Sequence, residues 1–149
     1  FLAGKTYLKK SSLATNTINK LNSSKIPDIK IMAWDGASYF SGSTLTIYWN
    51  PNEGNLIGPG QVQSPSLILA HECLHALRKL EDPQGQLIDK SIEMEDFDDM
   101  EEFRVIVLER SIVKQINKKL KNGPFESIRD SHNVVGIPVV SPTSKKEMK

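Results

Sequence analysis

The sequence predicts an α+β fold in a single domain spanning residues 1–149, with a small sheet packed on two long helices. Three features carry this prediction: two early segments rich in β-branched and aromatic residues, a capped apolar helix after them, and a long amphipathic helix that follows an acidic segment. A chain of 149 residues is long enough for one core, since about 70% of its unfolded surface can be buried.

The first part of the chain is expected to form one helix and two strands. Leucine and isoleucine at imperfect helical spacing predict a helix from about Lys5 to Asn22. Ile29 to Trp34 and Thr44 to Trp49 are predicted to be two strands of an antiparallel sheet. The run from Asn50 to Gln63 is rich in proline and glycine, which indicates a loop.

The clearest helix begins after Ser64, because a serine N-cap is followed by proline at the first helical position. Asp82 and Pro83 are expected to end this helix near Glu81. Its broad apolar face comprises Leu67, Ile68, Leu69, Ala70, Leu74, Leu77 and Leu80.

An acidic segment, Glu93 to Glu102, leads into a second long helix from about Asp98 to Lys121. After this helix we expect a short helix or turn around Ile128, a strand within Val134 to Val140, and a frayed tail from Ser144 to Lys149. The apolar stripe of the second helix comprises Val105, Leu108, Ile112 and Ile116.

Composition excludes several classes of protein. With 19 basic and 18 acidic residues the chain has a net charge of +1, so we expect no binding to nucleic acid. It has no run of about 20 apolar residues, which argues against a membrane protein. The single cysteine, Cys73, excludes an internal disulfide and suits a reducing compartment. We expect a monomer whose partner is a protein substrate.

The predicted apolar helix contains the motif HExxH, formed by His71, Glu72 and His75. A spacing of four residues places the two imidazoles about 40° apart around the helix and about 6 Å apart along it, so both project toward one ion. Glu72 lies beside the open coordination position, where it can take a proton from water and pass it to a leaving amine. The motif predicts peptide hydrolysis with one Zn²⁺ ion per chain.

The alternative is that these histidines are ordinary surface or half-buried residues. With three histidines in the chain, the chance of an accidental HExxH is on the order of one in a few hundred. Cys73 lies between the two ligands but points elsewhere, and is more often a small core residue than a ligand. We therefore favour the metal site.

A catalytic zinc site needs a third protein ligand. Glu81 could serve only if the helix ended early, because in a continuous helix it lies about 9 Å along and roughly 120° round from His75. The pair Glu101 and Glu102 is favoured, with one carboxylate on the zinc and the other holding a histidine N–H or a nearby cation. The alternative for this pair is an ordinary acidic first turn, stabilised by the helix dipole.

The segments HECLHAL and EEFRV resemble the HELxHA and EELRT pair of glutamate-ligand zinc endopeptidases, which include the clostridial neurotoxin light chains. The chain is more similar to the small NleD-type effector proteases of bacterial type III secretion. That resemblance covers about Ser38 to Pro142 and includes SYFSGSTLTIYWNP and an IRxSH segment. It implies a zincin-like fold, Glu102 as the third ligand, Glu101 behind it, secretion into the host cytosol, and MAP kinase activation loops as substrates.

Where the neurotoxins have Arg-x-x-Tyr, this chain has Arg129 and His132. The resemblance implies that Arg129 stabilises the developing oxyanion and that His132 donates a hydrogen bond to it. The alternatives are a surface arginine and a turn histidine without a catalytic role.

Related endopeptidases pair an extended substrate with an edge strand, and Thr44 to Trp49 is expected to be that edge, with Tyr48 facing the cleft and binding substrate. The alternative is that the strand aromatics lie in the core. An acidic run is usually a solvated face, but beside the cleft it would favour a basic substrate residue. That run comprises Glu93, Glu95, Asp96, Asp98 and Asp99.

Two other functions compete with effector proteolysis. One is a metal-stabilised interaction module that binds a partner without cutting it, and the other is a bacterial regulatory peptidase acting on a repressor. Glu72 argues against the first, because a purely structural metal site has no use for a general base.

Overall fold

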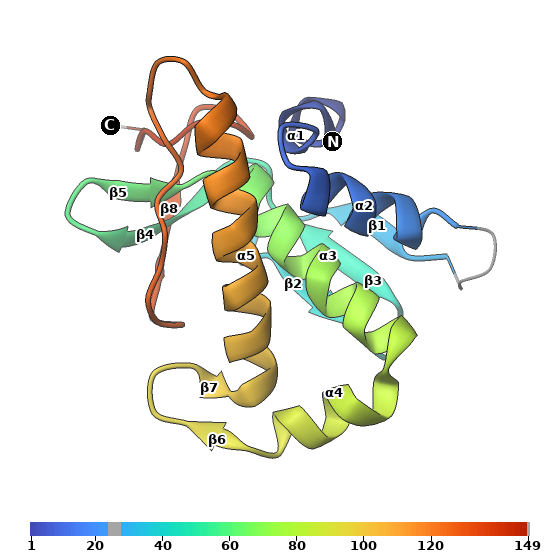
Figure 1. Cartoon of the computed structure of the whole chain (residues 1–149). Helices are drawn as coiled ribbons and strands as arrows, with labels where there is room; N and C mark the ends of the chain where they lie inside the picture. The colour runs from blue at the N-terminus through green and yellow to red at the C-terminus, as the bar shows by residue number, and fades with distance from the viewer. Residues whose placement is uncertain (24–27, 149) are drawn as a thin grey trace.

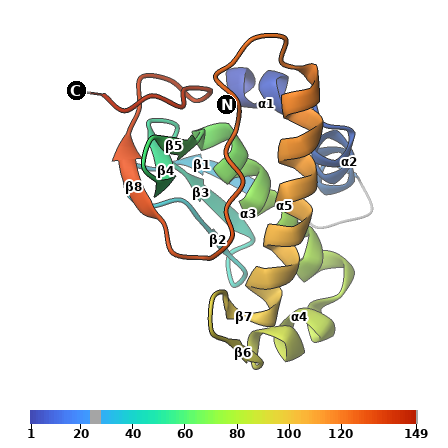
Figure 2. The same cartoon turned by 60° about the vertical axis from the view of Figure 1, so that its left-hand side comes forward.

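The fold is described by a computed structural model that covers residues 1–23 and 28–148. Helix α3 (Pro65–Glu81) lies at its centre, between helix α5 (Met100–Lys119) and a three-stranded sheet (Figure 1). Helices α1 (Leu2–Leu8) and α2 (Ser12–Leu21) pack on α3, and Figure 2 shows the fold from a second direction, with α5 crossing between α3 and α2 in the view. The architecture is α+β with small sheets packed on α3 and α5, as predicted.

The strands form three small sheets. The first has the order β1-β3-β2, from β1 (Lys30–Ala33), β3 (Thr46–Trp49) and β2 (Tyr39–Ser41). The second has the order β5-β4-β8, from β5 (Gln61–Gln63), β4 (Glu53–Gly58) and β8 (Val135–Pro138). The third is the hairpin of β6 (Glu93–Met94) and β7 (Asp98–Asp99).

Strand β3 is central in its sheet, so the prediction that Thr44 to Trp49 forms an edge is wrong. The predicted antiparallel pairing with the Ile29 to Trp34 segment is also wrong, because β1 and β3 run parallel. The intervening segment supplies β2, which folds back antiparallel on β3 and leaves only the far side of β3 for β1. Ile47 and Trp49 point from β3 into the core. The edge strand beside α3 is therefore β2.

The predicted loop from Asn50 to Gln63 is a β-hairpin of β4 and β5, and β4 also pairs antiparallel with β8. Gly60, with a φ of 70°, lies in the tight turn between β4 and β5. Gly54 lies inside β4, where an added Cβ would come within 2.7 Å of the Gln63 carbonyl oxygen. The glycines therefore mark a turn and a close packing contact instead of a long loop.

The helices also depart from the sequence expectations. The predicted helix over Lys5 to Asn22 is two helices, because Ser11 caps α2 by accepting a hydrogen bond from Ala14 N at 3.1 Å. A further helix, α4 (Pro83–Lys90), starts where we expected only a break, since Asp82 caps it and proline is favoured at a first helical position. The described residues around Ile128 contain no helix.

The buried carboxylate of Glu126 joins the N-terminus of α3 to distant parts of the chain. It accepts hydrogen bonds from Ser64 N at 3.0 Å and from the Tyr7 hydroxyl at 2.8 Å. Lys145 Nζ lies 3.6 Å from the same carboxylate. Segments from both ends of the chain therefore stabilise the start of the helix that carries the HExxH motif.

We expect the substitution Glu126→Ala to lower the free energy of unfolding by about 3–5 kcal/mol, because it leaves the buried ammonium of Lys145 and several donors without their acceptor. Urea unfolding followed by circular dichroism measures this change. Glu147→Ala is the control, since Glu147 is exposed and its loss should change the free energy by less than about 0.5 kcal/mol. Equal stability of the two variants would contradict the proposed joining role.

The C-terminal segment, which we expected to be frayed, contacts β8 in the structure. Val139 and Glu147 form an isolated antiparallel bridge, and Met148 N donates to Pro138 O at 2.8 Å. Lys149 lies outside the described residues. In the part of the chain that is described, none of the helices combines the length and apolar character needed to cross a lipid bilayer.

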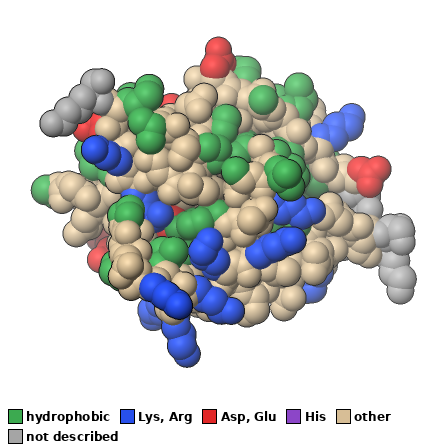
Figure 3. Space-filling model, turned by 90° about the horizontal axis from the view of Figure 1, so that it is seen from above, with side chains coloured by type: hydrophobic (Ala, Val, Ile, Leu, Met, Phe, Trp, Pro, Cys, Tyr) green, Lys and Arg blue, Asp and Glu red, His purple; other side chains and the backbone are tan. Residues whose placement is uncertain are grey.

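Charge is separated along α5. Its first turn holds the acidic pair Glu101 and Glu102, and its last turn holds Lys118 and Lys119. Figure 3 views the molecule from the end where α5 finishes, and Lys and Arg side chains gather on that face. Both charges suit the helix dipole. The acidic end of α5 is the end that meets the HExxH residues.

Candidate metal centre

His71, His75 and Glu102 converge on one point, which confirms the predicted grouping of the three residues. His71 and His75 project from the same face of α3, and their Nε2 atoms lie 3.1 Å apart. Glu102 reaches them from α5, with Oε1 3.2 Å from His71 Nε2 and Oε2 3.0 Å from His75 Nε2. His71 and Glu102 are buried, and His75 is half-buried. This group can hold a metal ion.

The spacing of the ligand atoms fits zinc. Zinc–nitrogen and zinc–oxygen bonds of about 2.0–2.1 Å in tetrahedral geometry separate neighbouring ligand atoms by about 3.3 Å. The three separations here lie between 3.0 and 3.2 Å. Two imidazoles and one carboxylate also form the ligand set of many catalytic zinc sites, which leave the fourth position open. The donor set therefore suits Zn²⁺.

Glu101 contacts the imidazole of His75 at Nδ1, the ring nitrogen that does not face the other two ligands. Its Oε1 lies 3.1 Å from His75 Nδ1, which frees Nε2 of that ring for an ion. Arg78 Nε and Gln86 Nε2 donate to the same carboxylate at 3.2 and 2.9 Å. These contacts and the charges of His75 and Arg78 hold the pKa of Glu101 below its usual value although burial opposes this. An ionised carboxylate on Nδ1 orients the ring and makes it a stronger ligand.

The imidazole of His71 also has a carboxylate on its Nδ1, which was not predicted from the sequence. Glu109 Oε2 lies 3.0 Å from His71 Nδ1, and Gln63 Nε2 donates to Glu109 Oε1 at 2.7 Å. Arg129 Nη2 lies 3.0 Å from Glu109 Oε2 and 2.7 Å from His71 Nδ1. Because a guanidinium only donates, the tautomer with a proton on Nδ1 pairs with Glu109 and not with Arg129. Each histidine thus has its own carboxylate.

The spacing of Glu109 from Glu102 and its apolar neighbours on α5 could have identified it from the sequence. It lies seven residues after Glu102, which is close to two helical turns, so both carboxylates share one face of α5. That face is otherwise apolar, and Glu109 replaces a residue of the buried stripe. The predicted stripe residue Leu108 is 37% exposed, which corrects that part of the prediction. A carboxylate in the middle of an apolar stripe is a sign of a buried polar role.

We expect Glu109→Gln to weaken zinc binding by about 10- to 100-fold, since a carboxylate that orients a ligating histidine typically contributes that factor. Competition with a chelator of known zinc affinity measures it. Glu147→Gln is the control, because it makes the same chemical change on an exposed residue away from the centre and should leave the affinity unchanged. Unchanged affinity in Glu109→Gln would show that Glu109 does not support His71.

The carboxylates around the centre surround the two imidazoles with negative charge. Burial alone would lower the pKa of His71, but hydrogen bonds to Glu102 and Glu109 raise it to about 9. The pKa of Glu102 is held far below its usual value, because both histidines donate to it and outweigh the cost of its burial. The same carboxylates favour a cation at this point, either a proton on His71 or a metal ion that replaces that proton.

Glu72 follows the first ligand on α3, and its carboxylate is buried beside the metal group. Burial raises its pKa, while the two histidines and the backbone N–H of Phe40 in β2 oppose that rise. It lines both cavities that adjoin the centre. A buried carboxylate with a raised pKa next to an open metal position has the properties of a general base.

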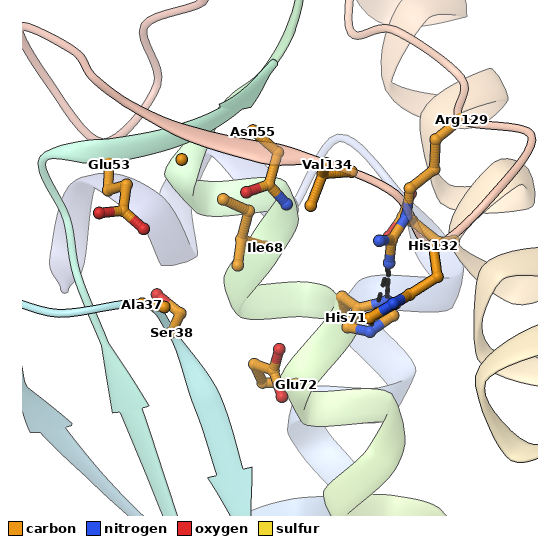
Figure 4. A pocket seen from close by; sticks show the side chains of 12 residues that line it. Ala37, Ser38, Glu53, Asn55, Ile68, His71, Glu72, Arg129, His132 and Val134 are labelled. Atoms are coloured by element: carbon orange, nitrogen blue, oxygen red, sulfur yellow. Dashed lines mark hydrogen bonds and ion pairs between the residues drawn. The ribbon is translucent and has the colours of Figure 1, made fainter. Parts of the chain in front are cut away.

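The two predicted oxyanion residues occupy different places. Arg129 is 5% exposed, and its guanidinium points at His71 (Figure 4) and also contacts Glu102 Oε1 at 3.3 Å. His132 lies at the mouth, with Nδ1 2.7 Å from Asp98 Oδ2, and it lines both cavities. Arg129 is thus part of the network that holds the ligands, and His132 is the one of the two within reach of solvent.

Some predicted residues lie away from the centre. Tyr48 stacks on Tyr39 with ring centroids 4.8 Å apart and lines neither cavity beside the metal group. Glu81 pairs with Lys20 at 2.8 Å, so it is excluded as the third ligand. Cys73 lies in the hydrophobic core, where burial raises the pKa of its thiol to about 12.

The predicted acidic run lies on the β6–β7 hairpin beside the mouth of the centre. Within it, Asp99 caps α5 by accepting from Glu102 N at 2.8 Å, and Asp98 holds His132. Glu93 and Glu95 are exposed.

Comparison with known protein families, with curated proteins and with solved structures gave no match to this chain.

Proposed function

We propose that this chain is a zinc-dependent endopeptidase with a zincin-like catalytic site. The observation that carries the proposal is the position of Glu72, a buried carboxylate that lines the same cavity as the grouped His71, His75 and Glu102. An ion that served only to stabilise the fold would be enclosed by four protein ligands and would need no base. Here three ligands converge and two cavities adjoin them.

Proton transfer, stabilisation of the oxyanion and positioning of the ligands are assigned to different residues of the chain. Bound at this site, zinc would supply a Lewis acid and would lower the pKa of a coordinated water. Glu72 accepts a proton from the attacking water and passes it to the amine nitrogen as the peptide bond breaks. His132, at the mouth of the centre, donates from Nε2 to the carbonyl oxygen as it becomes negative, which requires the imidazolium form because Nδ1 donates to Asp98. Arg129 fixes the ligands through Glu109 and Glu102.

Substrate binding is proposed along β2, the edge strand beside α3. Ser38, Tyr39 and Phe40 line the cavity that also contains His75 and Glu102. An extended peptide could add to this edge through backbone hydrogen bonds, which give affinity without demanding a particular sequence. This proposal replaces Thr44 to Trp49 and Tyr48 with β2 as the substrate-binding element.

The biological setting is also a proposal. The resemblance of HECLHAL and EEFRV to NleD-type proteases supports a bacterial effector that is secreted into the host cytosol and cleaves MAP kinase activation loops. The single buried thiol of Cys73 suits a reducing cytosol. A monomer that binds neither nucleic acid nor membranes is consistent with this role.

Fragment mapping tests the proposed activity. The zinc-loaded protein is incubated with separate host and bacterial lysates, and new N-termini are identified by sequencing. We expect new termini that disappear when a chelator is added and return with zinc. Termini confined to host kinases would support the effector, whereas termini confined to a bacterial repressor would favour a regulatory peptidase. No zinc-dependent termini in either lysate would leave the metal-stabilised interaction module as the better account.

A further inference from the structure

A cavity of about 250 Å³ opens from the metal centre toward β4, and we call it the β4 pocket. His71 and Glu72 form its inner end, and Glu53, Asn55, Ala37 and Gly136 line its outer part. Figure 4 shows the side chains of Glu53 and Asn55 directed from β4 into this space. Small-molecule sites usually occupy about 300–1,000 Å³, so the β4 pocket suits a single substrate side chain or chain end.

The alternation of side chains along β4 explains why Glu53 and Asn55 face the pocket. Gly54, between them, faces the small core of Val62 and Val139, where an added Cβ would lie 3.1 and 3.2 Å from those side chains. Residues two apart on a strand share a face, so Glu53 and Asn55 both point the other way. Packing on one side of β4 therefore presents a carboxylate and an amide on the other.

Glu53 has no ion-pair partner among the described residues. Two other carboxylates near the centre are engaged, Glu101 by Arg78 and His75 and Glu109 by Arg129, while Glu72 is assigned above to proton transfer. Among the described residues that line the pocket, Arg129 is the only Lys or Arg, and it is committed to Glu102 and Glu109. Glu53 is therefore a carboxylate of the pocket that no cation of the described residues pairs with, and it is free to bind a cationic group of a substrate.

Gly136 provides the room that Glu53 occupies. It lies in β8 opposite Asn55, and a Cβ built on it would come within 2.7 Å of Glu53 Oε1. Any larger residue at this position would push the carboxylate aside. The absence of a side chain at Gly136 thus lets the Glu53 carboxylate lie over β8 while it faces the pocket.

We propose that the β4 pocket is a substrate subsite that binds a cationic group, with Glu53 as its counter-ion and Asn55 as a hydrogen-bonding partner. The group is an arginine or lysine side chain at a fixed distance from an internal scissile bond, or a free α-amino group, in which case cleavage is confined to bonds near the N-terminus of the substrate. This proposal rests on the proposed peptidase function and names its substrate class. It differs from the expectation that the acidic run on the β6–β7 hairpin selects basic substrates.

Peptide retention tests the subsite without requiring turnover. Zinc-loaded Glu72→Gln protein is immobilised and exposed to a peptide library in which each position in turn holds arginine or its neutral isostere citrulline. Every peptide is made with a free and an acetylated N-terminus. Mass spectrometry measures the retention ratio of each pair. We expect one position at which arginine is retained about tenfold better than citrulline, or one family of free N-termini retained about tenfold better than the acetylated forms.

Variants then assign the preference to Glu53. Added to the same protein, Glu53→Gln should bring the retention ratio close to one, and Gly136→Ala should reduce it by displacing the carboxylate. Glu95→Gln is the matched control, because it removes an exposed carboxylate of the acidic run and should leave the ratio unchanged. Equal retention of arginine and citrulline peptides and of free and acetylated N-termini would overturn the subsite, as would a preference that survives Glu53→Gln.

Cleavage of the same library by the zinc-loaded wild-type protein separates the two proposals. Cleavage without a charge preference would keep the peptidase and remove the subsite. Retention that depends on charge and on Glu53, without any cleavage, would keep a cation-binding pocket and remove the peptidase. We expect both to hold, with the cationic group at the same offset from every cleaved bond.

Discussion

The substitution Glu72→Gln is expected to lower kcat/KM for peptide cleavage by about 10²- to 10⁴-fold, the range that general acid–base catalysis contributes. Glutamine fills nearly the same space but cannot accept the proton of the attacking water. The metal ligands His71, His75 and Glu102 are unchanged, so zinc content should stay at one ion per chain. Steady-state kinetics on a cleaved peptide and elemental analysis of the same sample measure the two quantities.

The control for this experiment lies on the same helix. Glu81→Gln makes the same chemical change at the end of α3, where Glu81 pairs with Lys20 away from the centre, and activity should stay within about twofold. Activity that survives Glu72→Gln would remove the proposed general base. Loss of zinc from Glu72→Gln would instead assign Glu72 to metal binding.

The substitution Glu102→Gln is expected to weaken zinc binding by more than about 100-fold, which corresponds to more than about 2.7 kcal/mol. An amide oxygen is neutral and is a much poorer zinc ligand than a carboxylate. Glu101→Gln, the neighbouring change, should weaken binding by only about 10- to 100-fold, because Glu101 acts through His75. Competition with a chelator ranks the two variants.

The ranking tests which glutamate of the pair binds the ion. Circular dichroism should show that both variants keep their helices, since Asp99 caps α5 through the backbone of residue 102 in either case. A larger loss of affinity in Glu101→Gln than in Glu102→Gln would exchange their roles. Equal small losses in both would indicate that neither is a ligand.

Local signals predicted the metal helix well. A serine cap, proline at the first position and the Asp82 break predicted a helix that begins after Ser64 and ends near Glu81, and α3 runs from Pro65 to Glu81. These signals act through neighbouring residues along the chain, so the sequence contains all the information they need. The HExxH spacing lies within one helix for the same reason.

Strand pairing depended on distant residues and was predicted poorly. β2 pairs with one side of β3 and leaves the other side for β1, which pairs in parallel, and β4 pairs with β8, which lies far along the chain beyond α5. The predicted loop over Asn50 to Gln63 failed because its glycines mark a turn and a packing contact inside a hairpin. Composition alone does not separate these uses of glycine.

The site residues also divide into those that the local sequence can reveal and those whose position depends on contacts between distant segments. The pair Glu101 and Glu102 could be inferred from the sequence because two histidines required a partner at the start of the next long helix, and the family resemblance then implied Glu102 as the ligand. Glu109 could have been found from its place in an apolar stripe. Glu53 could not, because its position in the β4 pocket depends on how β4 pairs with β8 and packs beside α3.

Anomalous diffraction from crystals of the zinc-loaded protein tests the central claim most directly. Data collected on both sides of the zinc absorption edge locate the ion without reference to the chain. We predict one strong peak per chain, about 2.0–2.2 Å from His71 Nε2, His75 Nε2 and one Glu102 oxygen, with Glu72 beside its open side. A peak elsewhere, or none in a fully loaded sample, would contradict the metal centre and the peptidase function built on it.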